Sequence, residues 1–219
     1  MYGYVIPGHR LVLERRRLGG VWFAVAEIPC CGLLARFGRR RAFRLLRREG
    51  ITRCVLPEQW AEEAAAYGLL PVEVYPLRQA LLPRLLDRQG DLQHASAVLR
   101  APYVSAAVSA AAMLLAQRVR YLSLETGGGT VELADMLRCR YGLCAGRIDA
   151  AALTVCFGGA PPPGPAICLG PDCARFQSLT YAPIPGLPQD APEQLIAALF
   201  EVGEIKKEEI YVKTIARNA

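Results

Sequence analysis

The sequence predicts an α/β fold of three layers, in which helices cover both faces of a mostly parallel sheet. Two observations favour it. Apolar strand-like runs alternate with segments of helical periodicity through the middle of the chain, and the runs are continuous rather than alternating, which is typical of strands buried on both faces. With 219 residues, of which 53% are hydrophobic and 21% charged, the chain has enough apolar surface for one core. We therefore expect a single α/β domain over residues 1–219.

The first 50 residues predict a hairpin region followed by a helix. Two apolar runs flank the segment RRRLGG within residues 1–30, and its glycines suit the unusual backbone angles of a turn between strands. Residues 38–50 place Phe43, Leu45 and Leu46 as a narrow apolar stripe on an Arg-rich helix that Gly50 ends. Residues 51–57 then predict a short buried strand.

The middle of the chain carries the clearest alternation of strands and helices. We expect a helix over residues 77–88, with Pro83 in its first turns or at a kink, and a strand over 95–99. A helix over 102–117, with Pro102 at a favourable first position, leads to a strand over 119–125. Residues 130–142 predict the next helix, which Gly142 ends.

The last part of the chain predicts short strands with short connections. Three apolar runs, each followed closely by glycine, cover residues 143–146, 153–158 and 166–170. Residues 158–166 and 182–192 are rich in proline and glycine, and we interpret them as loops rather than domain linkers. A helix over 192–203 and a strand over 208–215 complete the predicted fold.

The segment YLSLETGGGTVELADMLRCRYG, residues 121–142, combines a strand, three glycines and a helix. This layout resembles the dinucleotide-binding Rossmann unit, in which a helix N-terminus faces a phosphate. The predicted fold is therefore Rossmann-like. Gly127 and Gly129 occupy the first two positions of GxGxxG, but the third falls on Glu132. The acidic residue that the pattern places about 20 positions further on would be near Asp149, which precedes a predicted strand.

The glycine-rich loop is open to three interpretations. It can be a tight turn, with Thr126 or Thr130 capping the helix. It can also line a pocket, with Glu125 at the strand end, or hold the phosphate of a nucleotide-type cofactor. The candidate cofactor-binding residues are Glu125, Thr126, Gly127, Gly128, Gly129 and Thr130.

Positive charge is concentrated in the first half of the chain. The net charge is +6, residues 1–120 contain 18 Arg and 9 acidic residues, and every basic residue before Lys206 is Arg. Such a surface can bind nucleic acid or an acidic partner, although an Arg-rich composition alone produces solvated helix faces of the same kind. The candidate residues share one predicted helix: Arg39, Arg40, Arg41, Arg44 and Arg48.

Little else in the sequence indicates catalysis or metal binding. The two histidines, His9 and His94, lie in predicted turns, and no nucleophile elbow, zinc peptidase motif or P-loop is present. Two cysteine pairs, 139 with 144 and 168 with 173, have the loosest spacing of metal ligands, but their apolar neighbours favour small buried side chains. We therefore expect no metal site.

The cysteines and the chain start also bear on the compartment. Eight cysteines, with no visible signal segment among the first residues, favour reduced thiols in the cytoplasm. The longest apolar segment, residues 101–117, is too short to span a bilayer, so we expect no membrane association. Our hypothesis is a noncatalytic or degenerate Rossmann-like protein that binds a protein partner or a small ligand. The alternatives are an enzyme with a nucleotide-type cofactor at residues 126–130, and nucleic-acid binding through the arginines.

Overall fold

A computed structural model of the chain describes residues 1–30, 35–143, 146, 148 and 151–217. These residues group into two compact units, each formed by two separate stretches of chain. Unit 1 comprises Met1–Glu73 and Ala182–Ile210, and unit 2 comprises Val74–Tyr181 and Tyr211–Ala219. The sequence-based expectation of a single domain stays a prediction.

Unit 1 is built on a mixed five-stranded sheet, in the order β2-β3-β1-β4-β5. Its strands are β1 (Tyr2–Gly8), β2 (Val12–Leu18), β3 (Val21–Pro29), β4 (Arg53–Val55) and β5 (Leu70–Pro71). Strand β1 lies between β3 and β4 and is parallel to both, whereas β2 pairs antiparallel with β3. The predicted hairpin is confirmed as β2 and β3, but the expectation of only two strands in residues 1–30 was wrong, because β1 is a third.

The helices of unit 1 include one, α1 (Ala35–Arg48), that packs its expected apolar stripe against the sheet. They also include α2 (Ala61–Ala65) and α8 (Glu193–Glu201), with short 3-10 turns η1 (Glu58–Trp60) and η2 (Lys207–Glu209). In α1, Phe43 and Leu46 are fully buried and share a core cluster with Val5 and Ile28 of the sheet, while Leu45 is half-buried. The predicted C-terminal helix is confirmed as α8.

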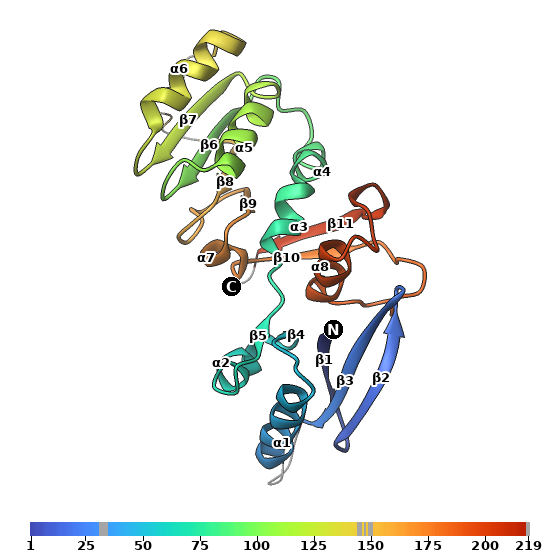
Figure 1. The fold of residues 1–219 in the computed structure, drawn as a ribbon. Coiled ribbons are helices and arrows are strands. Elements are labelled where there is room, and N and C mark those ends of the chain that lie inside the picture. Colours follow the sequence, from blue (N-terminus) through green and yellow to red (C-terminus); the bar gives the residue numbers. More distant parts are fainter. Residues whose placement is uncertain (31–34, 144–145, 147, 149–150, 218–219) are drawn as a thin grey trace. The chain divides into compact units, whose positions relative to one another are not determined.

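Unit 2 contains a four-stranded, fully parallel sheet in the order β7-β6-β8-β9. Its strands are β6 (Ser96–Ala101), β7 (Tyr121–Thr126), β8 (Leu153–Cys156) and β9 (Ala166–Cys168). Helices α5 (Ala106–Ala116) and α6 (Thr130–Tyr141) follow β6 and β7 in the chain, as Figure 1 shows. The mostly parallel sheet is thus confirmed, and the complete three-layer Rossmann-like topology stays a prediction.

The remaining elements of unit 2 are two short helices before the sheet in the chain, and a short helix and a two-stranded ribbon after it. They are α3 (Tyr75–Ala80), α4 (Leu82–Asp87), α7 (Pro171–Ala174), β10 (Gln177–Tyr181) and β11 (Val212–Arg217). Strands β10 and β11 form an antiparallel pair. The predicted C-terminal strand is therefore present as β11.

Two helix predictions in unit 2 need correction. The helix expected over 77–88 is divided into α3 and α4, with Pro83 in the first turn of α4, because proline has no N–H to continue the preceding helix. The helix expected from Pro102 begins at Ala106 instead. Ser105 is its N-cap: its backbone is extended and its hydroxyl accepts a hydrogen bond from the N–H of Val108 at 3.3 Å. Pro102 is left in the preceding loop.

Some predictions fall on residues outside the described part of the chain. The strand expected over 143–146 includes Cys144 and Ala145, and Asp149 is also outside it. Among the described residues, no helix is long and apolar enough to cross a membrane.

Candidate functional site

The glycine-rich loop joins β7 to α6 at the carboxyl edge of the parallel sheet, so the predicted strand, turn and helix layout is confirmed. Gly129 is the N-cap of α6 and has a left-handed backbone with φ 72°. A Cβ added to Gly127 would lie 2.4 Å from the carbonyl oxygen of Pro102, whereas one added to Gly128 would meet nothing within 4 Å. Turn geometry and packing therefore explain two of the three glycines.

The hydroxyl groups of the loop are bonded within it. The side chains of Thr126 and Thr130 hydrogen-bond each other, and the Thr130 hydroxyl also lies 3.4 Å from the Thr126 carbonyl oxygen. The expectation that one of these threonines caps α6 was wrong, because Gly129 occupies the N-cap and no side chain there makes a cap hydrogen bond. Glu132 is exposed in the first helical turn, where its charge repels an incoming phosphate.

Glu125, the polar residue expected at the strand end, forms an ion pair. Arg100 of β6 lies directly opposite it in the parallel register, and Arg100 Nη2 is 2.7 Å from Glu125 Oε2. Both side chains are more than one third exposed, so the pair contributes little to stability. A nucleotide at residues 125–130 stays a prediction.

The five candidate arginines of α1 do not form one free surface. Arg39 is half-buried: its Nε lies 2.8 Å from Glu63 Oε2, and its guanidinium lies 5.7 Å from the centre of the Trp60 ring. Arg40 Nε lies 3.8 Å from the same carboxylate, and Arg44 donates to the Arg40 carbonyl within the helix. Arg39 therefore anchors α1 to the segment around α2.

Three members of this set are exposed to solvent. Arg41, Arg44 and Arg48 are exposed. Nucleic-acid or acidic-partner binding by these residues stays a prediction.

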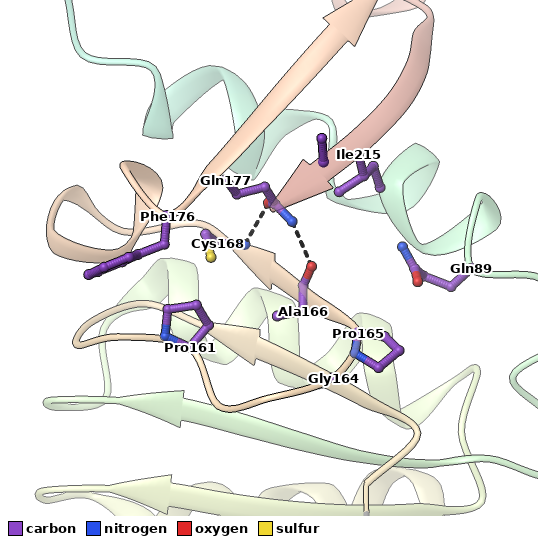
Figure 2. Close-up of a pocket in the computed structure, with 10 residues that line it drawn as sticks. Gln89, Pro161, Gly164, Pro165, Ala166, Cys168, Phe176, Gln177 and Ile215 are labelled. Carbon is purple, nitrogen blue, oxygen red and sulfur yellow. Dashed lines mark hydrogen bonds between the residues drawn. The ribbon is translucent and has the colours of Figure 1, made fainter. Parts of the chain in front are cut away.

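A pocket of about 230 Å³ lies beside β9 in unit 2. Figure 2 shows the lining, to which four separate segments of the chain contribute. The lining residues are Gln89, Pro161, Gly164, Pro165, Ala166, Cys168, Phe176, Gln177, Ile215 and Ala216. None of the residues predicted from the glycine-rich loop or from α1 lines this pocket.

The side-chain amide of Gln177 forms one wall of the pocket and bonds the edge of β9. Its Oε1 accepts from the Cys168 N–H at 3.0 Å, and its Nε2 donates to the Ala166 carbonyl at 2.7 Å (Figure 2). Gln177 is only 6% exposed. Because two bonds hold the amide, its orientation is fixed.

Two residues of α3 extend this bonding along the same segment. The buried guanidinium of Arg78 donates to the carbonyls of Cys168, Ala174 and Gln177 at 3.4, 3.0 and 2.8 Å. Gln79 donates to the Leu169 carbonyl at 2.8 Å. Side chains therefore satisfy the backbone groups of β9 and of the turn after it, which the exposed edge of a short strand would otherwise leave unpaired.

Three cysteines cluster next to the pocket. Cys156 and Cys168 lie opposite each other in neighbouring strands, and Cys173 lies in α7. All three are at most 1% exposed. Among the described residues, no group of three His, Cys, Asp or Glu side chains is arranged to hold a metal ion. Cys144, the partner of Cys139 in the other spaced pair, is outside the described residues.

The thiols of Cys168 and Cys173 interact directly. Their side-chain hydrogen bond is the largest cause that lowers the pKa of Cys173 to about 7, and the N–H groups of Gly170 and Leu169 act in the same direction. The same bond, together with burial, raises the pKa of Cys168. By contrast, burial raises the pKa of Cys54, in unit 1, to about 12.

Sequence reasoning missed Arg78, Gln79 and Gln177 because no local pattern marks them. It did identify the 168 and 173 spacing, but considered only a metal site and small buried side chains, and favoured the latter. His9 and His94 are both exposed in turns or bends.

No model of a known protein family matches the chain, and no curated protein matches it significantly.

Proposed function

We propose that this protein is a binding protein that holds a small, uncharged ligand in the pocket beside β9. One observation carries the proposal: four separate segments enclose the pocket, and a network of side-chain hydrogen bonds fixes one wall. Ligand sites in proteins are commonly largely preformed and mostly apolar, with a few fixed polar groups. The pocket beside β9 combines apolar side chains with the fixed amide of Gln177.

The lining supports the chemical class of the ligand. Its ten residues include no charged side chain, which favours an uncharged ligand over a phosphate. Phe176, Ile215 and the two prolines offer apolar contact. The side chain of Gln89 makes no hydrogen bond to the described residues, so its amide can pair with a donor or an acceptor of the ligand.

The test is a fragment screen by amide NMR, comparing neutral heteroaromatic amides with anionic nucleotides. We expect neutral fragments to shift the resonances of Ala166, Phe176 and Ile215. Ala216→Trp places a large ring at the pocket and should abolish these shifts. Thr214→Trp, at another exposed position of β11 that does not line the pocket, is the matched control and should retain them. Fragment-induced shifts that are the same in Ala216→Trp as in the parent protein would reject the proposal.

The same screen separates the alternatives. Nucleotide-induced shifts confined to residues 125–130 would favour a cofactor at the glycine-rich loop, and no fragment binding at all would favour a protein partner.

We place the protein in the cytoplasm, a proposal supported by the free thiols of the described cysteines. A Rossmann-like topology of unit 2 is supported by the strand order, in which β7 and β8 lie on opposite sides of β6.

A further inference from the structure

The cysteine cluster of unit 2 brings three sulfur atoms to one place in the fold. Strands β8 and β9 each end in a cysteine, Cys156 and Cys168, and the two lie opposite each other in register. Helix α7 begins three residues after β9 and carries Cys173 into the same buried cluster. Only four residues separate Cys168 from Cys173 in the chain.

The surroundings of Cys173 suit a nucleophilic sulfur. The N–H of Gly170 donates to its Sγ at 3.3 Å, and the protonated thiol can donate to the Cys156 carbonyl at 3.1 Å. Cys168 shares a side-chain hydrogen bond with it. The positive guanidinium of Arg78, bonded to the carbonyls of Cys168 and Ala174, flanks the segment that joins the two cysteines. Hydrogen bonds donated to a sulfur favour its thiolate form.

The pocket brings a small reagent to Cys168, the thiol neighbour of Cys173. Cys168 is part of the pocket lining, and its side chain is drawn among the lining residues in Figure 2. Cys54, although equally buried, lies in unit 1 outside this pocket lining. Pocket access and a neighbouring thiol therefore coincide at Cys168.

We propose that Cys168 and Cys173 are a redox-active dithiol that a small hydroperoxide, entering through the pocket, oxidises to an intramolecular disulfide. The Cys173 thiolate attacks one peroxide oxygen, the O–O bond breaks, and the leaving oxygen takes a proton to become water or an alcohol. Cys173 is then a sulfenic acid. The Cys168 sulfur attacks Sγ of Cys173, the S–S bond forms, the S–O bond breaks, and water leaves with the Cys168 proton. The two thiols lose two electrons in total, and the peroxide gains them.

The dithiol proposal does not depend on the ligand proposed for the pocket, because its test measures the oxidation state of two sulfur atoms. Purified, fully reduced protein is treated with one equivalent of hydrogen peroxide, then unfolded in an alkylating agent. Proteolysis on the amino side of Asp172 separates Cys168 from Cys173, so a disulfide between them holds two peptides together. We expect this linked pair to form before oxidation of the exposed Cys30 and Cys139, and to be reversed by a dithiol reductant.

Cysteine-to-serine variants identify which two cysteines form the disulfide. Cys156→Ser should retain the linked peptides, whereas Cys168→Ser should lose them and leave a sulfenic acid at Cys173 that a cyclic dione traps. Cys54→Ser, which changes another buried cysteine, is the matched control and should behave as the parent protein. Recovery of Cys168 and Cys173 as alkylated thiols after Cys139 has been oxidised would overturn the proposal. So would a disulfide that forms only in denaturant, and both results come from the parent protein even if a variant fails to fold.

Discussion

The side-chain amide of Gln177 bonds Cys168 in the way a neighbouring strand would. In a parallel sheet, the C=O of a residue accepts from the N–H of one residue in the neighbouring strand. The N–H of the same residue donates to the C=O two positions earlier in that neighbouring strand. Gln177 reproduces this pattern with a single amide, accepting from the Cys168 N–H and donating to the Ala166 carbonyl. Strand β9 is therefore closed on its outer side by a side chain from β10.

Replacing Gln177 with leucine should destabilise the protein by about 2 kcal/mol or more, because it leaves two buried backbone groups without partners. The matched control is Gln89→Leu, which changes the same residue type at the pocket without removing a hydrogen bond within the described chain and should stay within about 0.5 kcal/mol. Urea unfolding followed by far-ultraviolet circular dichroism measures both. Equal midpoints for the two variants would contradict the structural role of the amide.

Alanine at Gly127 should destabilise unit 2 by about 1–3 kcal/mol, because its Cβ would meet the Pro102 carbonyl oxygen at 2.4 Å. Alanine at Gly128 faces open space and has no left-handed backbone to strain, so its effect should be small. Thermal unfolding of the two variants compares neighbouring glycines in one loop. If Gly128→Ala were the more damaging change, the loop would have a role other than packing.

Oxidation of Cys173 should accelerate as pH rises through about 7, since the thiolate is the reactive form and its pKa is lowered to about that value. Between pH 6 and 8 the initial rate should rise about tenfold and then level off, as the thiolate fraction does. Cys54, with its pKa raised to about 12, should remain a thiol over the same range. Quenched peroxide reactions analysed by peptide mass spectrometry give both rates. A pH-independent rate at Cys173 would contradict the proposed ionisation.

Arg39→Gln should destabilise unit 1 by about 1–2 kcal/mol, because it leaves the partly buried Glu63 carboxylate without its 2.8 Å partner. Arg48→Gln, on the exposed part of the same helix, should change stability by less than about 0.5 kcal/mol. Trp60 lies beside Arg39, so its fluorescence reports the unfolding of this region. Equal effects of the two changes would argue against an anchoring role for Arg39.

If α1 binds nucleic acid, its exposed arginines should carry the affinity. Fluorescence anisotropy with a labelled single-stranded RNA should then show binding that weakens steeply with salt, and a triple change of Arg41, Arg44 and Arg48 to Gln should reduce that slope. The control is Arg118→Gln, a single arginine of unit 2 paired with Asp87. Salt-independent binding, or equal binding by the triple variant, would remove this alternative.

Local patterns predicted the parts of the fold that local interactions determine. Apolar runs and glycine ends located β6, β7 and α6 within a few residues, because burial and capping act over one or two turns. They did not predict that β1 lies at the centre of its sheet. That position depends on pairing with β3 and β4, and the Cys54 partner of Gly3 is about 50 residues away in the chain.

The candidate site was less predictable than the fold for the same physical reason. Arg78 bonds carbonyls that lie 90, 96 and 99 residues further along the chain. An arginine that bonds carbonyls is indistinguishable in sequence from one that faces water. The glycine run was conspicuous because its backbone requirement is local, whereas the pocket is assembled by distant segments.

The division of the chain between its two units has a consequence for synthesis on the ribosome. Because unit 1 is completed by residues 182–210 and unit 2 by β11, neither unit has all its residues when the chain has been translated to Tyr181. At that stage β10 still lacks its only strand neighbour among the described residues. Unit 1 therefore has all its residues only once residue 210 has been translated, and unit 2 only once β11 has, so neither unit can complete its fold early in translation.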